Sequence, residues 1–209
     1  MVYESRTYAL SPGRLPEYLS MLHGDTAVLS LLAPHLVGFW IAESGSLNAA
    51  HHLWRYEDRT DRARARSSLA AEPAMQRFLS RAAPLLQSQH SSLMQGVVLS
   101  PDTPPERSPS GVFDRVSMAL HLTSGKNEIQ HQVRLILTET FQTIATLERR
   151  MFEQGGPSCE LLLVLRSDSL AQRDDRWANA HRRLQNVDFV SEAGFSSQLL
   201  LPTAFSPWR

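Results

Sequence analysis

The sequence predicts an α+β protein built from two tandem β-α-β-β-α-β units. Two observations predict this class: strand-like and helix-like segments recur in the same order in both halves of the 209-residue chain, and a proline-rich segment lies between the halves. Such a repeat indicates two copies of one unit, each a four-stranded antiparallel sheet covered by helices on one face. We therefore expect one unit at residues 1–101, a linker at residues 102–111, and a second unit at residues 112–209.

The first half shows every element of such a unit. Its first residues alternate with period two and are rich in strand formers, and apolar residues at helical spacing follow until Pro34. Two apolar runs then flank a polar segment with Gly and Asn, which predicts a hairpin. The expected elements are a strand at 2–10, a helical region at 14–33, the hairpin at 36–58, a helical region from 59 to 86, and a strand at 93–99.

The second half repeats this order with fewer polar residues in its strands. The segment before it contains four prolines among Ser, Asp and Glu, a composition that does not pack and is typical of a linker. The expected elements are a strand at 112–122, a long helix face from 129 to 147, an apolar strand at 159–165, a helix around 177–184, and a strand at 195–201.

Composition excludes several classes of function. The 21 basic and 21 acidic residues balance, so no overall field favours nucleic acid or an anionic membrane. Cys159 is the single cysteine, which excludes an intrachain disulfide and a Cys-based zinc cluster. No apolar run approaches the ~20 residues of a membrane span, and the first residues lack the pattern of a targeting signal. We expect a cytoplasmic protein, and the near-absence of Lys is typical of a GC-rich bacterium.

The candidate site lies on the first strand and the hairpin. Side chains alternate along a strand, so Glu4, Arg6 and Tyr8 share one face. His52, Trp54 and Tyr56 share a face of the hairpin in the same way, and Trp40 on its first strand adds an aromatic wall. If these faces line one cavity, they could hold an aromatic or carboxylate substrate. The alternative is a buried ion pair and a packed interface.

No cofactor is predicted. His51 and His52 are adjacent, so on a strand they point to opposite faces and cannot chelate one metal together. The other histidines show no regular ligand spacing. Haem remains a minor alternative, since it needs only one axial His and leaves almost no sequence trace. The arginine-rich run at residues 59–66 is most simply a solvated helix face, and it lacks the interleaved aromatics of a nucleic-acid site.

Several spaced motifs in residues 2–101 resemble the NIPSNAP family. They read, in order, Tyr3-Glu4-x-Arg6-Thr7-Tyr8, Pro12-Gly13-x-Leu15-x-x-Tyr18, Val37-Gly38-Phe39-Trp40, Gly45-x-Leu47-Asn48 and His52-Leu53-Trp54-x-Tyr56. The resemblance implies a ferredoxin-like unit of the dimeric α/β-barrel superfamily, in which two sheets pair around a shared cavity, and two units in one chain would supply both halves. From residue 112 on the Glu-x-Arg-x-Tyr and His-Leu-Trp-x-Tyr motifs are absent, so the resemblance does not imply a symmetric pair of sites.

Two functions follow from these observations and stay open. In the first, the chain binds a small organic molecule in the barrel cavity, between the sheets, and acts as a cofactor-independent biosynthetic enzyme of the cyclase, isomerase or monooxygenase type. Arg6 would hold a carboxylate or enolate, His52 would move a proton, and Glu4 would orient Arg6 or serve as the base. In the second, the chain is a non-catalytic interaction or structural module with a packed interior. Homo-oligomerisation is compatible with both.

Overall fold

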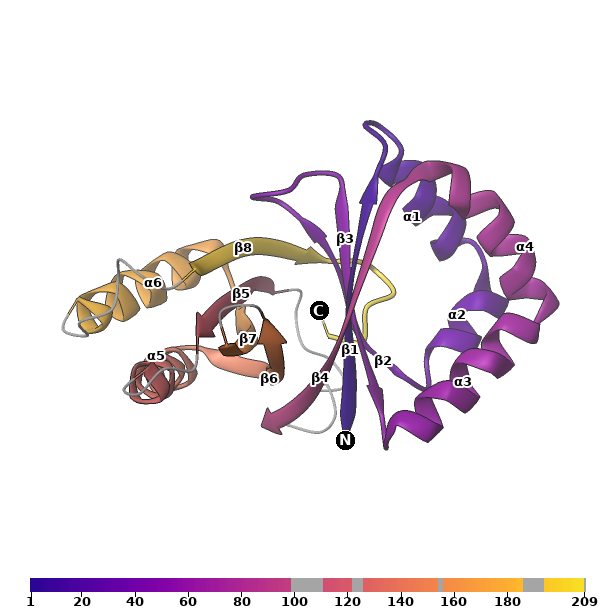
Figure 1. Cartoon of the computed structure of the whole chain (residues 1–209). Helices are drawn as coiled ribbons and strands as arrows, with labels where there is room; N and C mark the ends of the chain where they lie inside the picture. Colours follow the sequence, from indigo (N-terminus) through magenta and orange to yellow (C-terminus); the bar gives the residue numbers. More distant parts are fainter. Residues whose placement is uncertain (99–110, 122–125, 154–155, 186–193, 209) are drawn as a thin grey trace. The chain divides into compact units, whose positions relative to one another are not determined.

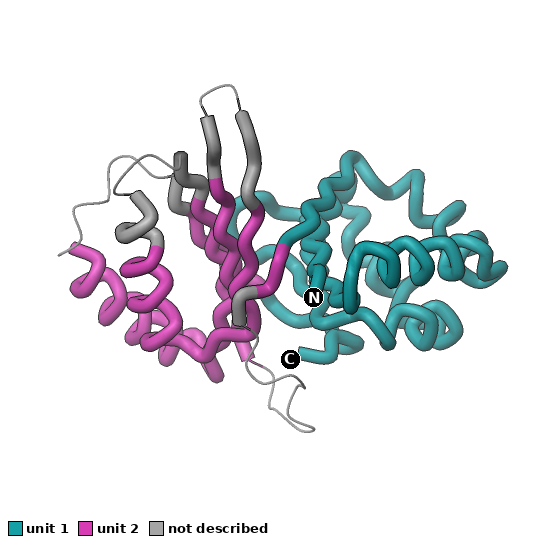
Figure 2. Tube along the Cα trace, turned by 60° about the horizontal axis from the view of Figure 1, so that its bottom comes forward, with its two compact units in different colours: residues 1–94, 201–209 teal, residues 95–200 magenta. Residues whose placement is uncertain are grey.

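The computed structural model describes residues 1–98, 111–121, 126–153, 156–185 and 194–208 (Figure 1). These residues fall into two compact units: residues 1–94 with 201–209 form unit 1, and residues 95–200 form unit 2 (Figure 2). The chain passes from unit 1 to unit 2 within one strand and returns within another. The linker expected at residues 102–111 lies, apart from Gly111, outside the described residues.

Unit 1 has the strand order β4-β1-β3-β2, with its helices on one face of the sheet (Figure 1). Pairing of β1 with β3 and of β3 with β2 is antiparallel. This is the order of a ferredoxin-like unit. The elements are β1 (Val2–Leu10), α1 (Leu15–His23), α2 (Thr26–Leu32), β2 (Leu36–Ala42), β3 (Ala49–Tyr56), α3 (Arg59–Ala71), α4 (Pro73–Ala82), the 3-10 turn η1 (Ala83–Leu85) and β4 (Leu86–Val98).

Unit 2 repeats this order as β8-β5-β7-β6. Its strands are again paired antiparallel where β5 meets β7 and β8 and where β6 meets β7. The elements are β5 (Val112–His121), α5 (Lys126–Thr140), β6 (Gln142–Glu153), β7 (Gly156–Ser167), α6 (Leu170–Leu184) and β8 (Gly194–Pro202).

Local sequence explains where the helices begin. The side chain of Asp25 caps α2 by accepting a hydrogen bond from the Val28 N–H at 3.1 Å, and Asp58 caps α3 through the Asp61 N–H at 2.7 Å. Proline stands in the first turn of α1 and of α4, where its missing N–H costs nothing. In unit 2 the side chain of Ser169 caps α6 as Asp25 and Asp58 cap their helices, by accepting a hydrogen bond from the Gln172 N–H.

Two expected boundaries were wrong. The helix face traced to residue 147 ends at Thr140, and β6 follows at once, because a run of apolar residues fits a helix face and a buried strand equally well. The helical region expected up to residue 86 ends at Leu85, and β4 starts at Leu86 rather than at residue 93.

No described helix has the length and apolar character needed to cross a membrane.

A bulge in β2 decides which of its side chains face the helices. The register with β3 shifts between Leu36 and Gly38, so that Phe39 pairs with His52 and Trp40 pairs with His51. Phe39 then joins the core under the helices, while Trp40 lies on the other face of the sheet. The Trp40 ring covers Gly38 so closely that a Cβ on Gly38 would overlap ring atoms Cη2 and Cζ2.

Gly38→Ala should therefore destabilise the protein by about 1–3 kcal/mol through overpacking. The measurement is the free energy of unfolding from a denaturant titration. In the double variant with Trp40→Phe the colliding ring atoms are gone, so its loss should be smaller than the sum of the two single losses. Strictly additive losses would show that the close approach of Trp40 to Gly38 does not matter.

Candidate functional site

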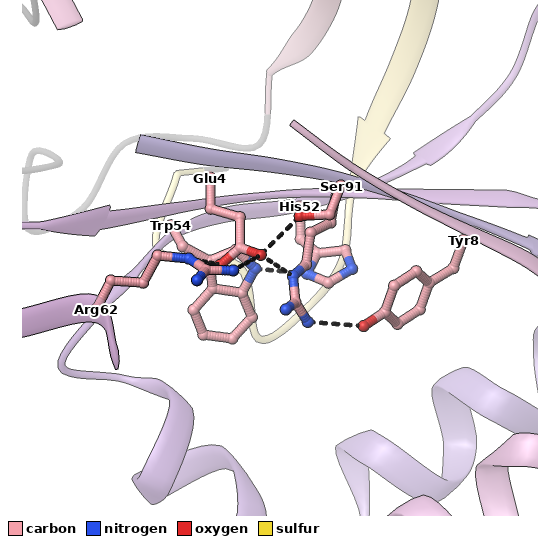
Figure 3. A network of polar contacts seen from close by, with 7 residues as sticks. Glu4, Tyr8, His52, Trp54, Arg62 and Ser91 are labelled. Atoms are coloured by element: carbon pink, nitrogen blue, oxygen red, sulfur yellow. Dashed lines mark hydrogen bonds and ion pairs between the residues drawn. The ribbon is translucent and has the colours of Figure 1, made fainter. Parts of the chain in front are cut away.

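Strand register brings six of the predicted residues together on the helix-covered face of unit 1. Cross-strand pairing places Glu4 opposite Trp54 and Arg6 opposite His52, while Val2 pairs with Tyr56. Tyr8 follows two residues after Arg6 on the same strand and face. Figure 3 shows Glu4, Tyr8, His52 and Trp54 of this group under the sheet, together with Arg62 and Ser91.

Glu4 is the centre of an ion cluster. Its side chain is fully buried, and its two oxygens accept four hydrogen bonds (Figure 3). Arg62 on α3 donates from Nε to Oε2 at 3.0 Å and from Nη2 to Oε1 at 2.8 Å. Arg6 Nε donates to Oε1 at 2.9 Å, and Ser91 Oγ on β4 donates to the same oxygen at 2.6 Å. The cluster ties α3 and β4 to β1.

These partners set the ionisation of Glu4. Burial raises the pKa of the carboxyl, but hydrogen bonds from Arg62 and Ser91 and the charge of Arg6 outweigh burial and lower the pKa from 4.5 to about 2. Glu4 is therefore a fixed anion at neutral pH. Such a group is a poor general base, and its acceptor positions are occupied by Arg62, Ser91 and Arg6.

Arg6 connects this ion cluster to the aromatic part of the site. Its Nη1 donates a hydrogen bond to the Tyr8 hydroxyl oxygen at 2.9 Å, while its Nε is held by Glu4. Tyr8 in turn meets the His52 ring edge to face, with 4.5 Å between centroids. The Tyr8 oxygen is the acceptor of this bond, so its O–H is still available to donate to a third group.

His52 lies at the centre of the aromatic cluster. Phe39 stacks on its ring at 4.9 Å between centroids, and Trp54 packs edge to face at 5.5 Å. Trp54 Nε1 also donates a hydrogen bond to His52 Nδ1 at 2.7 Å. An indole N–H can only donate, so Nδ1 must be the unprotonated nitrogen and the proton of the neutral ring is on Nε2.

The Nε2 atom of His52 is buried and has no hydrogen-bond partner in the described part of the chain. Burial, the positive charge of Arg6 and the neighbouring His51 lower the pKa of His52 well below its usual 6.5. The ring is thus neutral at physiological pH. A buried N–H without a partner costs about 1–3 kcal/mol, so an acceptor that reached this nitrogen would gain a hydrogen bond.

A cavity of about 390 Å³ lies next to these side chains, between the sheet and the helices of unit 1. Its wall is largely apolar and aromatic, with Arg6 and Arg66 as its only charged side chains among the described residues. It is lined by Arg6, Tyr8, Tyr18, Leu22, Leu32, Phe39, His52, Trp54, Tyr56, Arg66, Leu69, Ala70, Met75, Phe78, Leu79, Ala82, Ala83, Leu86 and Gln89.

Two tyrosines in this wall are held in the protonated form. Burial, followed by the negative charge of Glu4, raises the pKa of Tyr56 to about 12. Burial also raises the pKa of Tyr18 on α1 above its usual value of 10. Both hydroxyls are therefore hydrogen-bond donors rather than bases at neutral pH.

Unit 2 repeats the ion pair of unit 1 but not its polar wall. Asp114 on β5 is buried and accepts three hydrogen bonds from Arg173 on α6, from Nε at 3.0 and 2.9 Å and from Nη2 at 2.8 Å. The two residues are 59 positions apart, against 58 for Glu4 and Arg62. The strand-to-helix ion pair is thus common to both units and reads as structural.

The remaining positions of the site are aliphatic in unit 2. Val116 pairs with Leu163 where Arg6 pairs with His52, and Leu165 stands opposite Asp114 where Trp54 stands opposite Glu4. All three aliphatic side chains are fully buried in one core cluster. At these matching positions, the described part of unit 2 therefore has no counterpart of Arg6 and His52.

The structure corrects the sequence analysis in two respects. The site was expected between two sheets, but its residues face the helices of their own unit, since alternation shows which side chains share a face and not what covers that face. Trp40 was expected in the wall. The β2 bulge turns Trp40 to the other face and puts Phe39, which was not predicted, against His52.

The arginine run also differs from expectation. Arg64 is exposed and Arg59 is exposed, as a solvated helix face requires, but Arg62 binds Glu4 and Arg66 lines the cavity. The repeated carboxylate-to-arginine spacing in the two halves was a signal that could have found Arg62. Among the described residues, no three His, Cys, Asp or Glu side chains are grouped closely enough to hold a metal ion.

Comparison with known proteins places this geometry in a family. The NIPSNAP family model matches residues 3–101, a range that contains every residue of the polar network. Human NipSnap homolog 3A is 26% identical over 225 aligned residues, which cover 99% of this chain and 85% of the human protein. The chain belongs to the NIPSNAP family.

Solved structures are also similar to this chain. A NIPSNAP domain protein from Burkholderia xenovorans is 35% identical and covers 49% of this chain and 100% of its own, with a TM-score of 0.45. A structure from Fusobacterium nucleatum, described as a candidate monooxygenase, has a TM-score of 0.64 at 12% identity and covers 96% of this NIPSNAP chain and 91% of its own. The predicted class, tandem ferredoxin-like units of the dimeric α/β-barrel type, is confirmed.

Proposed function

We propose that the unit 1 cavity of this NIPSNAP protein binds a small, conjugated or aromatic organic molecule through an enolic, phenolic or enolate oxygen. The observation that carries the proposal is His52, a residue in the wall of a largely apolar cavity whose buried Nε2–H has no hydrogen-bond partner among the described residues. Hydrophobic walls with a few convergent polar groups are typical of small-molecule sites.

Charge decides which ligand atom meets this donor. Glu4, Arg6 and Arg62 together carry one net positive charge, and Glu4 stays ionised down to a pH of about 2. A guanidinium and a neutral N–H stabilise an oxyanion, whereas both would leave a bound cation without an acceptor. The site therefore suits a ligand whose oxygen is anionic or becomes so.

The catalytic form of this proposal is acid-base chemistry without a cofactor. His52 Nε2–H and Arg6 would stabilise an enolate or phenolate, while the Tyr8 hydroxyl would be the group that exchanges a proton with the ligand. His52 then acts as a hydrogen-bond donor and not as the base, because Trp54 occupies its other nitrogen. Isomerisation, cyclisation and cofactor-independent oxygenation all pass through such an anion, and isomerisation needs nothing beyond the ligand itself.

A binding comparison tests the proposal. Naphthol should bind at least about tenfold more tightly than naphthalene, which has the same ring system but no oxygen, because each factor of ten needs only about 1.4 kcal/mol of hydrogen bonding. The readout is a fluorescence titration of each compound. His52→Phe should remove the preference for naphthol, and Arg64→Gln, an exposed change on α3, should keep it.

Equal affinity for naphthol and naphthalene would contradict an oxyanion site. So would a preference that survives His52→Phe. In that case the second function from the sequence gains ground, a non-catalytic module with a packed interior. The observation that favours this alternative is the Asp114–Arg173 pair, which supports a structural role for the matching Glu4–Arg62 pair of the polar network.

A further inference from the structure

We propose that Arg66 is a second anion-binding residue of the cavity, and that the ligand of this protein accordingly carries a carboxylate in addition to its enolic or phenolic oxygen. The inference rests on the proposed function and narrows its substrate class to aromatic or conjugated hydroxy and keto acids.

Arg66 stands apart from the other arginines of α3. It lies one turn after Arg62, so the two side chains share the helix face that covers the sheet. The guanidinium of Arg62 donates its hydrogen bonds to Glu4, and Arg64, on the solvent-facing side of the helix, forms an ion pair with Asp61 at 2.8 Å. Arg66 is partly buried and lines the cavity, and the described residues offer it no hydrogen bond or ion pair.

The charge of the wall is unbalanced at this position. Arg6 and Arg66 are cationic, and no Asp or Glu is among the described residues that line the cavity. Glu4 cannot serve Arg66, because its oxygens already accept four hydrogen bonds from Arg6, Arg62 and Ser91. A partly buried guanidinium is costly without an anion, so the ligand is the group that completes it.

A carboxylate fits this position better than other anions. The guanidinium fork of Arg66 matches the two oxygens of a carboxylate in a bidentate geometry. The rest of the cavity wall is mainly apolar, with Leu69, Met75, Phe78 and Leu79 among its residues, and would not satisfy the many acceptor oxygens of a phosphate. An aromatic acid places its ring against these side chains and its carboxylate on Arg66.

The test compares naphthol with a hydroxynaphthoate that bears its hydroxyl and carboxylate on different rings. The parent protein should bind the acid at least about tenfold more tightly than naphthol. Arg66→Gln should abolish this advantage and leave naphthol affinity within about twofold, while Arg64→Gln should change neither. Arg66→Lys should restore part of the advantage, because it keeps the charge but not the fork.

The outcomes separate this inference from the proposed function. If naphthol binds in a His52-dependent way but the added carboxylate gains nothing, Arg66 is not a ligand residue and only this inference fails. If Arg66→Gln weakens the acid and naphthol equally, Arg66 supports the fold of the cavity, and the inference fails as well. If the acid depends on Arg66 while His52→Phe changes neither affinity, the proposed oxyanion site fails and the carboxylate site stands.

Discussion

Glu4→Gln should lower the free energy of unfolding by about 3–5 kcal/mol at pH 7. Glu4 is fully buried and holds Arg6, Arg62 and Ser91. Removing the anion leaves two partly buried guanidinium groups without their counter-charge, and breaking a buried pair from one side has a cost of this size. The measurement is a denaturant titration of the parent and of the variant. The two free energies of unfolding are compared with the same m-value, the slope of the free energy against denaturant concentration.

The pH dependence gives this prediction a second readout. The pKa of Glu4 is about 2 in the folded protein against 4.5 as its reference value. A depressed carboxyl pKa contributes stability that is present above pH 4.5 and is lost as the pH falls toward 2, in total about 3 kcal/mol at about 1.4 kcal/mol per unit. The parent should lose this stability within that window, and Glu4→Gln should lose much less.

Asp114→Asn is the matched control in unit 2. Asp114 holds Arg173 as Glu4 holds Arg62, but burial raises the pKa of Asp114 above its usual value despite that partner. Its removal should therefore leave the acid-dependent loss of stability between pH 4.5 and 2 in place. If Asp114→Asn removed the loss of stability between pH 4.5 and 2 and Glu4→Gln did not, the assignment of this acid sensitivity to Glu4 would be wrong.

Period-two alternation was enough to group Glu4, Arg6 and Tyr8, and to group His52 with Trp54. Both groupings rest on a local property, because neighbouring side chains of any regular strand point to opposite faces. Trp40 was misplaced because alternation holds only along an unbroken strand. The bulge between Leu36 and Gly38 reverses the faces of the residues that follow it, Trp40 included.

Tertiary contacts decided the rest of the site. Arg62 looks like one more charge on a solvated helix unless the two halves are compared, and its hydrogen bonds to Glu4 between α3 and β1 reveal its role. Ser91 carries no sequence signal at all. The choice of which sheet face the helices cover is likewise a property of the folded unit, which is why the cavity was expected on the wrong side of β1 and β3.

The aliphatic residues of unit 2 could also be seen in the sequence, as strands that had lost their polar residues. Structure adds the positional match: Val116 replaces Arg6, Leu163 replaces His52 and Leu165 replaces Trp54 in the register. Asp114 and Arg173 persist where these others have gone. The ion pair is present in both units, which is expected of a structural contact. The positions of Arg6, His52 and Trp54 have polar or aromatic side chains in unit 1 only, which is expected of residues with a role in the unit 1 cavity.

His52→Phe should weaken naphthol binding by about tenfold to a hundredfold while changing the free energy of unfolding by less than about 1 kcal/mol. The binding loss follows from removal of the Nε2–H donor, worth about 1–3 kcal/mol where its partner is buried. Stability hardly changes because two effects offset each other. The variant removes one buried N–H without a partner, and it leaves the indole N–H of Trp54 without its acceptor.

The shape of the site allows this exchange. The His52 ring is stacked on Phe39 and meets Tyr8 and Trp54 edge to face, contacts that a phenyl ring can also make. A histidine present for packing would thus be replaced by Phe at no functional cost. A histidine that serves as a hydrogen-bond donor cannot be replaced by Phe without loss of function. Any catalytic rate that depends on stabilising an oxyanion should therefore fall by about 10²- to 10³-fold in the variant.

The same variant should change the pH dependence of stability at higher pH than Glu4→Gln does. The pKa of His52 in the folded protein is well below 6.5, so the unfolded chain takes up the proton first and the parent loses stability as the pH falls below 6.5. His52→Phe should not show this loss. Naphthol binding to the parent should show no inflection near 6.5, since His52 stays neutral there. A marked loss of stability at pH 7 together with unchanged naphthol affinity would instead make His52 a packing residue and leave the cavity without its oxyanion donor.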